Sequence, residues 1–360
     1  MLLCLLIAQL FPGDAQDMRL SGKNTVKQTT NSKAEKKART KKRLRLEALE
    51  DRRLMTVPAT TPDFIFPADA GVIDLSNWNE NPALNVDPAP GNDDTAALQA
   101  ALDSLVPPEG SPNNTPTNIN RILYLPAGEY EISQQLTVPI RTSNRASVGA
   151  ILQGQNRDSV TIKVQDNIDF EGSALAFQVR TADAFRNAVR DLTIDIGAGN
   201  PNAKGLTFVA NNNGIVSNVH IVSSDPTHAG SVGLELGTGA NGPLLVENIS
   251  VDGFDIGIRT AFQDASQTFD GVLLTNQQQF GWANEGDQNV FAQNVTSVNE
   301  VPAIWNHPIP RDEGPLLQNS VFTLIDATLT GVGDASEVEA IRSEERLYAR
   351  NVATPGYGRA

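Results

Sequence analysis

The sequence predicts an all-β fold, a single-stranded parallel β-helix or solenoid that carries one capping helix at its N-terminal end. Three observations lead to this prediction. A short phrase of one small polar residue followed by an apolar, a polar and a second apolar residue recurs between residues 189 and 352. Each repeat is too short to bury its own apolar face, so it must stack on its neighbours. An amphipathic helical segment, residues 92–105, precedes the first strand-like segments.

The recurring phrase has the period of one lap of a stacked strand coil. The steps between the first polar residues of successive copies are 27, 30, 23, 23, 25 and 32 residues. Successive laps of such a coil lie about 4.8 Å apart, the spacing of hydrogen-bonded strands. The copies are Asp191-Leu192-Thr193-Ile194, Asn218-Val219-His220-Ile221, Asn248-Ile249-Ser250-Val251, Gly271-Val272-Leu273-Leu274, Asn294-Val295-Thr296-Ser297, Asn319-Ser320-Val321-Phe322 and a weaker one that begins at Asn351-Val352.

The apolar residues of each phrase stand two positions apart, so within a strand they point to the same side. Val219 and Ile221 are therefore expected to face the core, and the polar residues between such pairs to face outward: His220, Ser250 and Thr296. The asparagine that opens most copies fits a turn, because Asn tolerates left-handed backbone angles. Gly271 opens one copy and supports a backbone role, since Gly adopts the same angles without a side chain.

The capping helix is predicted to begin within Asn92-Asp93-Asp94-Thr95, where Asp or Thr can cap free backbone N–H groups. Its apolar residues fall on one face: Leu98, Ala101, Leu102 and Leu105. Pro107-Pro108 ends it, and strands follow at residues 122–125 and 130–132. We expect this helix to cover the first open edge of the coil.

This opening segment resembles the N-terminal module of the pectate-lyase superfamily of right-handed parallel β-helices. Members carry a Gly-x-x-Asp-Asp-Thr-x-Ala-(Leu/Ile)-Gln-x-Ala-(Leu/Ile) phrase and then a strand with Pro-Ala-Gly-x-Tyr. The chain has Gly91-Asn92-Asp93-Asp94-Thr95-Ala96-Ala97-Leu98-Gln99-Ala100-Ala101-Leu102 and then Tyr124-Leu125-Pro126-Ala127-Gly128-Glu129-Tyr130. The resemblance implies a right-handed coil. It leaves the activity open, because the module occurs in lyases, hydrolases, isomerases and phage tail proteins.

The middle of the chain is similar to the first half of glycoside hydrolase family 55, exo-acting β-1,3-glucanases built from two tandem β-helices. The similarity spans about residues 85–355 and rests on Ala203-Lys204-Gly205-Leu206, Gly214-Ile215-Val216-Ser217-Asn218-Val219, Ser231-Val232-Gly233-Leu234-Glu235 and Asn276-Gln277-Gln278-Gln279-Phe280. In that family the second β-helix and the junction place the catalytic acid, so no catalytic acid carries over to this chain by position. We expect either a fragment of a larger enzyme or a one-helix binding and scaffold protein.

Charge and composition argue against several classes of protein. The chain has 360 residues and a formal net charge of −14, but residues 1–53 carry 13 basic and 6 acidic residues, which leaves the remainder at −21. Residues 54–360, with this negative charge, are a poor electrostatic match for nucleic acid or an anionic membrane. No apolar run reaches the ~18 residues that a membrane helix needs. The single cysteine, Cys4, excludes an internal disulfide and a cysteine-based metal site.

The first 57 residues are predicted to be a targeting and export region that is largely disordered. Met1 to Phe11 is apolar without preceding positive residues, an imperfect signal peptide. Leu44 to Met55 resembles the export-associated Leu-Glu-x-Leu-Glu-x-Arg-x-Leu motif of many planctomycete surface and secreted proteins; the alternative is a solvated basic helix. Residues 58–85 are expected to form an extended lead-in and residues 86–360 the β-helix domain, which ends without an obvious closing cap. A secreted or cell-surface protein is therefore expected.

Two acidic segments beside tryptophans are candidates for chemistry. Glycosidases use two carboxylates across the scissile bond, and polysaccharide lyases use a base with a cation or Arg. In a predicted loop, Gly281 to Gln288, and in the segment that follows Trp305, we predict as catalytic Glu285, Asp287, Asp312 and Glu313. As substrate-binding residues we predict Trp282, Trp305, His307 and Arg311. The alternative is that the tryptophans cover the core and that the acids are solvated surface charges.

No metal site and no cofactor is predicted, and Ca²⁺ is considered only for the lyase alternative. Asp252 and Asp255 flank a turn, but two carboxylates are too few for a calcium site, and ordinary turn chemistry explains them better. His220 and His228 are potential bases for which the sequence names no partner.

The leading functional hypothesis is an exported carbohydrate-active enzyme that hydrolyses or eliminates glycosidic bonds with acidic side chains on its outer wall. The acidic body favours a neutral glucan over pectate. The alternative is a non-catalytic surface protein whose wall binds glycans, and a third hypothesis, a phage-type adhesin, predicts a trimer. The expected partner is a polysaccharide, with no nucleic acid and no membrane span, and the oligomeric state stays open.

Overall fold

The computed structural model describes residues 71–76, 86–105, 122–138, 149–177, 184–237, 241–261, 266–286, 289–307 and 321–359. All of them belong to one unit, Val57–Ala360. The export region predicted over residues 1–57 lies outside the described residues, as does most of the lead-in. Within the described ranges, no helix has the length and apolarity needed to span a membrane.

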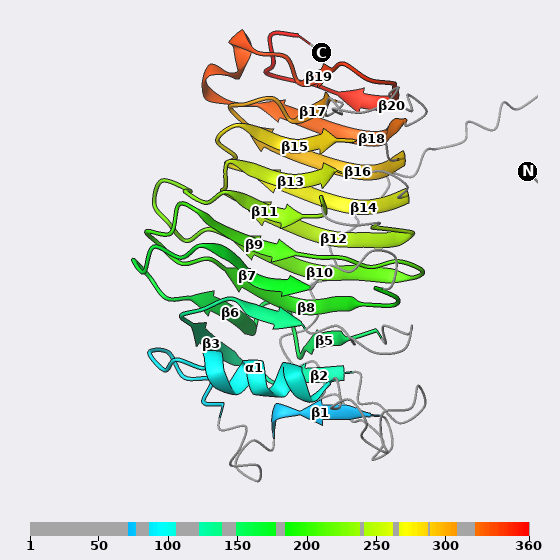
Figure 1. Ribbon diagram of the computed structural model, residues 1–360. Coiled ribbons are helices and arrows are strands. Elements are labelled where there is room, and N and C mark those ends of the chain that lie inside the picture. Colours follow the sequence, from blue (N-terminus) through cyan, green and yellow to red (C-terminus); the bar gives the residue numbers. More distant parts are fainter. Residues whose placement is uncertain are drawn as a thin grey trace, which may run out of the picture. The chain divides into compact units, whose positions relative to one another are not determined.

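Two parallel sheets form the walls of this unit, and their strands stack in successive layers from β1 to β20 (Figure 1). The twelve-stranded sheet contains β1 (Val72–Asp74), β2 (Ile122–Leu125), β3 (Gly128–Ile132), β5 (Ile151–Gly154), β6 (Val160–Val164), β8 (Ala188–Asp195), β10 (Gly214–Val222), β12 (Leu244–Asp252), β14 (Ser266–Thr275), β16 (Asn289–Asn299), β18 (Phe322–Gly331) and β20 (Leu347–Ala353). The eight-stranded sheet contains β4 (Leu136–Val138), β7 (Gly172–Phe177), β9 (Ala203–Thr207), β11 (Val232–Glu235), β13 (Ile256–Ala261), β15 (Phe280–Glu285), β17 (Ile304–His307) and β19 (Ile341–Ser343).

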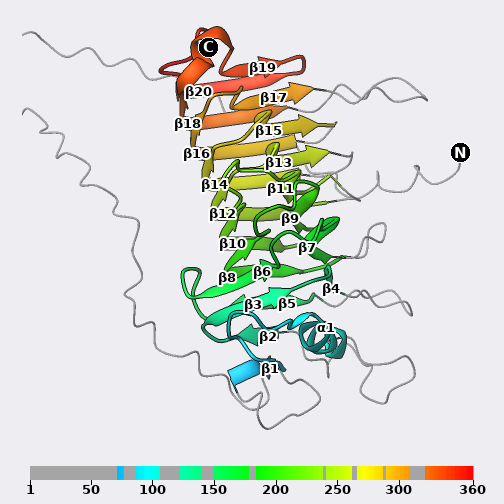
Figure 2. The same ribbon diagram turned by 90° about the vertical axis from the view of Figure 1, so that its left-hand side faces the viewer.

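From β7 onward the chain alternates between the two sheets, so each lap supplies one strand to each of them. Neighbouring strands within a sheet come from consecutive laps and run parallel. In the side view the strands of the two sheets form two columns (Figure 2). The protein is therefore the right-handed parallel β-helix that the repeats and the opening segment predict.

Each long strand of the twelve-stranded sheet contains one residue with a left-handed backbone angle. We call these residues, whose φ values lie between 49° and 73°, the corner residues: Asp191, Asn218, Asn248, Gly271, Asn294, Asp326 and Asn351. The ladder skips the corner residue, because Ser217 pairs with Arg190 and Val219 pairs with Leu192. As a result Val216 and Val219 are both buried although they are three positions apart. The corner residue thus divides each strand into two segments. Side chains alternate between core and surface within each segment, and the alternation shifts by one residue at the corner.

Side chains of the corner residues also bond to one another between laps. Asn218 Nδ2 donates to Asp191 Oδ1 at 2.6 Å, and Asn248 Nδ2 donates to Asn218 Oδ1 at 2.8 Å. At Gly271, which has no side chain, the neighbouring Asp270 takes over and accepts from Asn294 Nδ2 at 2.6 Å. The predicted left-handed role of the repeated asparagines is confirmed.

One copy of the repeat lies at a different position from the predicted one. Asn319, where this copy was predicted to begin, lies outside the described residues. Its predicted role as the corner residue is wrong, because the corner residue of that lap is Asp326. The residues on either side of Asp326 pair with those on either side of Asn294. Asp shares with Asn the ability to adopt left-handed angles. The lap before this corner is therefore the long one of 32 residues and the lap after it has 25.

The apolar pairs of the phrases build a core that continues through the laps. Val219, Ile221, Ile249 and Val251 are at most 2% exposed. Each such side chain contributes about 1.5–3 kcal/mol when it leaves water. The polar residues between them reach the outer surface as predicted: His220, Ser250 and Thr296.

The single α-helix of the described residues, α1 (Thr95–Ser104), packs on β4, the end strand of the eight-stranded sheet. Leu98, Ala101 and Leu102 form its buried face. Gln99 takes the place of a neighbouring strand, because its amide donates to Thr137 O and accepts from Thr137 N, both at 2.8 Å. This pairing occupies an edge that would otherwise be open to another strand. The predicted covering of the first edge of the coil is confirmed.

Two aspartates fasten the start of the helix. Asp93 Oδ1 accepts from the Thr95 backbone at 3.1 Å, as predicted for an acid at this position, and Asp93 Oδ2 accepts from Ser133 Oγ at 2.6 Å. Asp94 makes no capping bond to the helix and instead accepts from Asp87 N at 2.9 Å. Burial raises the pKa of Asp94 to about 6. These bonds tie the start of the helix to Asp87, just after the lead-in, and to Ser133, just after β3.

At the other end, the weak copy of the repeat that begins at Asn351-Val352 lies in strand β20. A short 3₁₀ helix, Gly333–Glu337, precedes β19. Tyr357 then folds back, and its hydroxyl donates to Val301 O at 2.8 Å. The described part of the last lap thus packs against the lap before it.

Candidate active site

Strand alternation decides which side chains reach the outer face of the eight-stranded sheet. Ile258, Trp282 and Ile304 are in register and face the core. The residues one position later therefore face outward and form the first outer row: Glu235, Arg259, Ala283, Trp305 and Arg342. The residues two positions further along form the second outer row: Ala261, Glu285 and His307. These two rows contain most of the charged and aromatic side chains described below. Lys204, in register with Val232, and Glu344, directly after β19, complete them.

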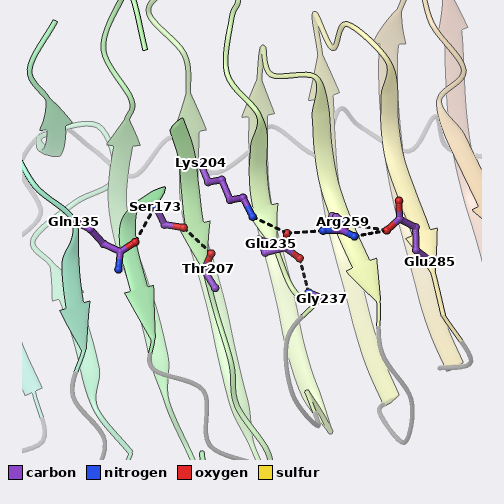
Figure 3. Close-up of polar contacts among 8 residues, drawn as sticks. All are labelled: Gln135, Ser173, Lys204, Thr207, Glu235, Gly237, Arg259 and Glu285. Atoms are coloured by element: carbon purple, nitrogen blue, oxygen red, sulfur yellow. Dashed lines mark hydrogen bonds and ion pairs between the residues drawn. The ribbon is translucent and has the colours of Figure 1, made fainter. Parts of the chain in front are cut away.

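Arg259 on β13 bridges two glutamates from the neighbouring strands (Figure 3). Its Nη1 lies 3.3 Å from Glu235 Oε2 on one side, and its Nη2 lies 2.6 Å from Glu285 Oε2 on the other. Arg259 Nε also donates to Glu285 Oε2, at 2.7 Å. The guanidinium is thus engaged on both sides by carboxylates of the chain itself.

Glu235 is the buried member of this group. Its side chain is 2% exposed, against 33% for Arg259 and 13% for Glu285. Glu235 also accepts from Lys204 Nζ at 3.3 Å and from Gly237 N at 2.7 Å. A buried carboxylate requires such partners, because an unpaired buried charge costs several kcal/mol. We call Lys204, Glu235, Arg259 and Glu285 the charged array.

The glutamates of the charged array stabilise the positive charge of Arg259. Burial lowers the pKa of Arg259, but the charges of Glu235 and Glu285 outweigh burial, so the pKa is raised overall. Toward the N-terminal laps the contacts on this face become neutral (Figure 3): Ser173 N donates to Gln135 Oε1 at 3.0 Å, and Ser173 Oγ lies 2.6 Å from Thr207 Oγ1. The charged groups of this wall therefore gather on β9 to β19.

Next to Glu285, strand β17 presents a stack of rings. Trp305 stacks on Phe280 with centroids 4.7 Å apart and an angle of 22°, and on His307 at 4.7 Å and 11°. The guanidinium of Arg342 lies 6.0 Å from the Trp305 ring centroid. Ring stacking and cation–π contact fix the orientation of these side chains. The imidazole of His307 is therefore held in a defined direction.

His307 has a carboxylate partner from the following lap. Its Nδ1 lies 2.8 Å from Glu344 Oε2, and this hydrogen bond lowers the pKa of Glu344. A carboxylate at Nδ1 leaves Nε2 as the ring atom that exchanges a proton with a ligand. Glu285 is the cross-strand neighbour of His307 on the other side. We call Glu285, His307 and Glu344 the acid–base group.

The two carboxylates of the acid–base group come from laps on either side of His307. Two strand spacings separate them, roughly 9.6 Å at the backbone. This backbone separation lies just outside the ~6.5–9.5 Å between the carboxyl groups of inverting glycosidases, and Glu344 already bonds His307. The side chains of this group that can exchange protons with a ligand are therefore Glu285 and His307, with the Trp305 ring beside them.

A polar ladder inside the coil supports the acid–base group from below. Thr260 Oγ1 donates to Asn284 Oδ1 at 2.7 Å, Asn284 Nδ2 donates to Asn306 Oδ1 at 2.7 Å, and Asn306 Nδ2 donates to Ser343 Oγ at 3.0 Å. Asn284, Asn306 and Ser343 each directly precede one member of the group in the sequence. Thr260, Asn284 and Asn306 are buried, whereas Ser343 at the end of the ladder is exposed. Satisfied buried networks are rigid. The ladder therefore fixes the three strand segments relative to one another.

The structure places Trp282 in the core, so its predicted role as an exposed sugar platform is wrong. Its side chain is 0% exposed, and its Nε1 donates to Thr260 Oγ1 at 3.1 Å. Phe269 and Phe322 pack edge-on against it at centroid distances of 4.3 and 5.1 Å. The predicted loop from Gly281 is in fact strand β15. Because a strand alternates its side chains, Trp282 must face inward when Glu285 faces outward.

Three of the predicted site residues are brought together: Glu285, Trp305 and His307. They lie in neighbouring strands, since residues 304–307 form β17. Trp305 is half-buried within the ring stack. The remaining predictions lie outside the described residues and stay predictions: Asp287, Arg311, Asp312 and Glu313.

Sequence reasoning missed Lys204, Glu235, Arg259 and Glu344. A signal for two of them exists in the chain. An apolar–Gly–apolar segment recurs in Val232-Gly233-Leu234, Ile256-Gly257-Ile258 and Phe280-Gly281-Trp282. The residues that follow it, Glu235, Arg259 and Ala283, are in register in the sheet. Aligning the chain on this second repeat would have brought Glu235 beside Arg259.

The other residues considered from sequence have local roles. Asp252 Oδ1 accepts from Thr275 Oγ1 at 3.0 Å and from Asn276 Nδ2 at 2.6 Å, which is turn chemistry. His220 faces outward on β10, and burial together with the nearby Arg157 lowers its pKa. No group of three or more His, Cys, Asp or Glu side chains in the described ranges is arranged to hold a metal ion.

Solved structures that are similar to the chain include enzymes and a viral protein. The catalytic domain of Agl-KA superimposes with a TM-score of 0.54 at 15% identity, over 82% of this chain and 55% of that one. ORF18 of Geobacillus virus E2 gives 0.43 at 12% identity, over 79% and 60%. The A-module of the mannuronan C-5 epimerase AlgE4 from Azotobacter vinelandii gives 0.47 at 15%, over 78% and 75%. The chain thus spans 60% and 55% of the first two structures. At 15% identity, the superposition on Agl-KA shows the fold alone.

Comparison at the level of families is more specific. No curated protein matches the chain. The model of one family, Rhamnogalacturonase A/epimerase, pectate lyase-like, matches residues 85–305. The match includes α1, the charged array and Trp305, and it covers more than half of the chain. The chain therefore belongs to the rhamnogalacturonase A/epimerase, pectate lyase-like family.

Proposed function

We propose that the protein cleaves glycosidic bonds in a polysaccharide at the outer face of the eight-stranded sheet. The observation that carries this proposal is the acid–base group, in which Glu285 lies beside a His307 held by Glu344. The name of the family, which joins rhamnogalacturonase A and an epimerase as pectate lyase-like proteins, supports a polysaccharide as the substrate. A rigid wall of parallel strands also suits a polymeric ligand.

Cleavage needs one group that takes a proton and one that gives a proton. Glu285 Oε2 accepts two hydrogen bonds from Arg259, so the carboxylate of Glu285 is the proton acceptor. His307 is the donor, because Glu344 and the ring stack direct its Nε2 toward the leaving glycosidic oxygen. In hydrolysis Glu285 would activate a water molecule; in elimination it would take the proton beside a uronate carboxyl group.

The cations of this wall favour hydrolysis of a neutral glycan over elimination. Elimination requires a cation that stabilises the charge developing on the uronate. Lys204 and Arg259 are already paired with Glu235, and Arg342 Nε lies 3.5 Å from Glu344 Oε1. These three cations are thus engaged by carboxylates of the chain itself. The net charge of −14 acts in the same direction, since it repels an acidic polymer.

The test is the release of reducing ends by the full chain from laminarin, pectate and alginate, each with and without Ca²⁺. We expect product from at least one polymer, and a loss of about a hundredfold or more in Glu285→Gln and in His307→Ala. Glu247→Gln is the matched control: Glu247 lies on the other sheet and accepts from Ser217 Oγ, a bond that Gln can keep. This control should retain activity within about twofold.

Two outcomes would reject the proposal. One is the absence of product from every polymer tested. The other is a Glu285→Gln protein as active as the Glu247→Gln control. An unsaturated product that absorbs ultraviolet light would show that the reaction is elimination and not hydrolysis. The assignment of the active site to Glu285 and His307 would then stand.

Two narrower expectations remain predictions. The resemblance to glycoside hydrolase family 55 goes beyond the matched family, and we propose a β-glucan such as laminarin as the first polymer to examine. Export to the cell surface rests on a motif outside the described residues. Glycan binding without any product would favour the non-catalytic alternative.

A further inference from the structure

A different wall of the coil carries an exposed aromatic row. Four large apolar side chains in the described part of the chain are at least 40% exposed: Leu273, Phe291, Val332 and Tyr348. Phe291, at 51%, and Tyr348, at 52%, are the two most exposed of them. Both lie in one cross-strand row of the twelve-stranded sheet, because Thr323 pairs with Phe291 on one side and with Tyr348 on the other.

The two aromatic side chains stand on every second lap. Their strands, β16 and β20, flank β18 at the C-terminal end of the coil (Figure 1). Two strand spacings put them roughly 9.6 Å apart at the backbone. The residue between them, Thr323, is short and only partly exposed. The row therefore presents two aromatic rings with the shorter, polar Thr323 side chain between them. Their separation is comparable to the length of two sugar units in an extended chain.

Hydrogen-bonding side chains accompany the rings. The row two residues further along the same strands contains Gln293 and Arg350, which are in register with Ile325 between them. Gln293 is exposed and is held by a bond from its Nε2 to Asp270 Oδ2 at 2.8 Å. A sugar ring has an apolar face that packs on an aromatic ring and hydroxyl groups around its edge. The wall offers partners for both.

Three other occupants fit this wall less well. A protein interface has a contiguous apolar core, whereas threonine separates these rings. An anionic membrane would meet Glu247 and Asp270 on the same wall and a net charge of −14. A second copy of the chain would bring the same negative charge. The carboxylates disfavour an acidic glycan for the same reason.

We propose that this wall binds an extended neutral glycan across β16, β18 and β20, with one sugar ring on Phe291 and another, two units along the chain, on Tyr348. The surface belongs to the other sheet from the acid–base group and holds polymer without cleaving it. It goes beyond the proposed function, because binding here does not depend on Glu285 or His307.

Affinity electrophoresis of the full chain tests this proposal, with laminarin, glucomannan and xyloglucan as neutral glycans and pectate as the acidic one. We expect at least one neutral glycan to retard the wild-type protein and pectate to leave its migration unchanged. The double variant Phe291→Ala/Tyr348→Ala should lose retardation on the order of tenfold, whereas Phe291→Trp should keep it. Leu273→Ala, which removes an exposed apolar side chain from a different row, is the matched control and should migrate as the wild type does.

The outcomes separate this surface from the cleavage site. Glu285→Gln should be retarded as the wild type is, so loss of retardation in that variant would overturn the proposal. Equal retardation of the double variant and the wild type, or retardation by none of the neutral glycans, would also overturn it. So would a dimer, or binding to anionic vesicles, that is present in the wild type and lost in the double variant. Circular dichroism confirms that each variant is folded.

Discussion

The corner residues and the charged array are both periodic features of the same coil, yet they depend on different physics. A corner residue is specified by its own backbone: seven positions share left-handed φ values, and six of them are Asn or Asp. The charged array is specified by contacts between laps, for example Arg259 with Glu235, 24 residues apart, and with Glu285, 26 residues apart. Local conformational preference is visible in a sequence, whereas pairing between laps becomes visible only when the register is known.

The largest expected effect comes from removing the cation of the charged array. Arg259→Ala leaves Glu235, whose side chain is 2% exposed, without its bond to the guanidinium. Lys204 Nζ and Gly237 N still bond Glu235 in this variant, so the expected loss is that of the charge-assisted hydrogen bonds of Arg259, about 3 kcal/mol. Urea unfolding should show this loss, and Arg350→Ala, which removes an exposed arginine from the other sheet, should change the free energy of unfolding by less than about 0.5 kcal/mol. Similar losses in the two variants would remove the distinction between the array and an ordinary charged surface.

A pair of substitutions at one corner separates backbone from side chain. Asn218→Ala should destabilise the fold by about 2 kcal/mol, because alanine disfavours the left-handed angle and the bonds to Asp191 and Asn248 are lost. Asn218→Gly loses the same bonds but keeps the angle, so about 1 kcal/mol is expected. Thermal or urea unfolding measures both. If the Gly variant loses as much as the Ala variant, the side-chain ladder and not the backbone angle specifies the corner.

The last expected effect is a pH dependence at the capping helix. Burial raises the pKa of Asp94 to about 6, above its usual value of 3.8, so the folded protein holds this proton more tightly than the unfolded chain. This contribution to stability is complete below about pH 4 and is lost as the pH rises through about 6. Asp94→Asn, whose side-chain oxygen can keep the bond from Asp87 N, does not titrate. Relative to this variant, the wild type should lose stability between pH 4 and pH 7, which thermal unfolding at a series of pH values measures. A difference in unfolding temperature between the two proteins that stays constant over this range would contradict the expected titration of Asp94.

Much of the fold follows from the sequence for local reasons. Asn218 and Asn248 mark corners, Val219 and Ile221 alternate inward, and Leu98 and Leu102 define the face of the helix. The misplaced copy at Asn319 shows the limit of this reasoning, since the spacing fitted and the left-handed residue was Asp326.

The site was less accessible to sequence reasoning. Glu285, Trp305 and His307 were predicted because acids, a ring and an imidazole stood close together in the chain. Trp282 failed because its segment was taken as a loop, and one position of strand alternation turns a side chain from the surface to the core. Glu344 was missed because it reaches His307 across 37 residues.

Hydrogen exchange tests the central claim most directly, with the full-length Glu285→Gln protein and a short oligosaccharide of the polymer that the wild type cleaves. The account predicts that the ligand slows amide exchange in β13, β15 and β17, the strands that carry Arg259, Glu285 and His307. The neighbouring strands of the other sheet, β12 and β14, should exchange as they do without ligand. Slowed exchange confined to the twelve-stranded sheet, with β13, β15 and β17 unchanged, would contradict the assignment of the active site to the eight-stranded wall.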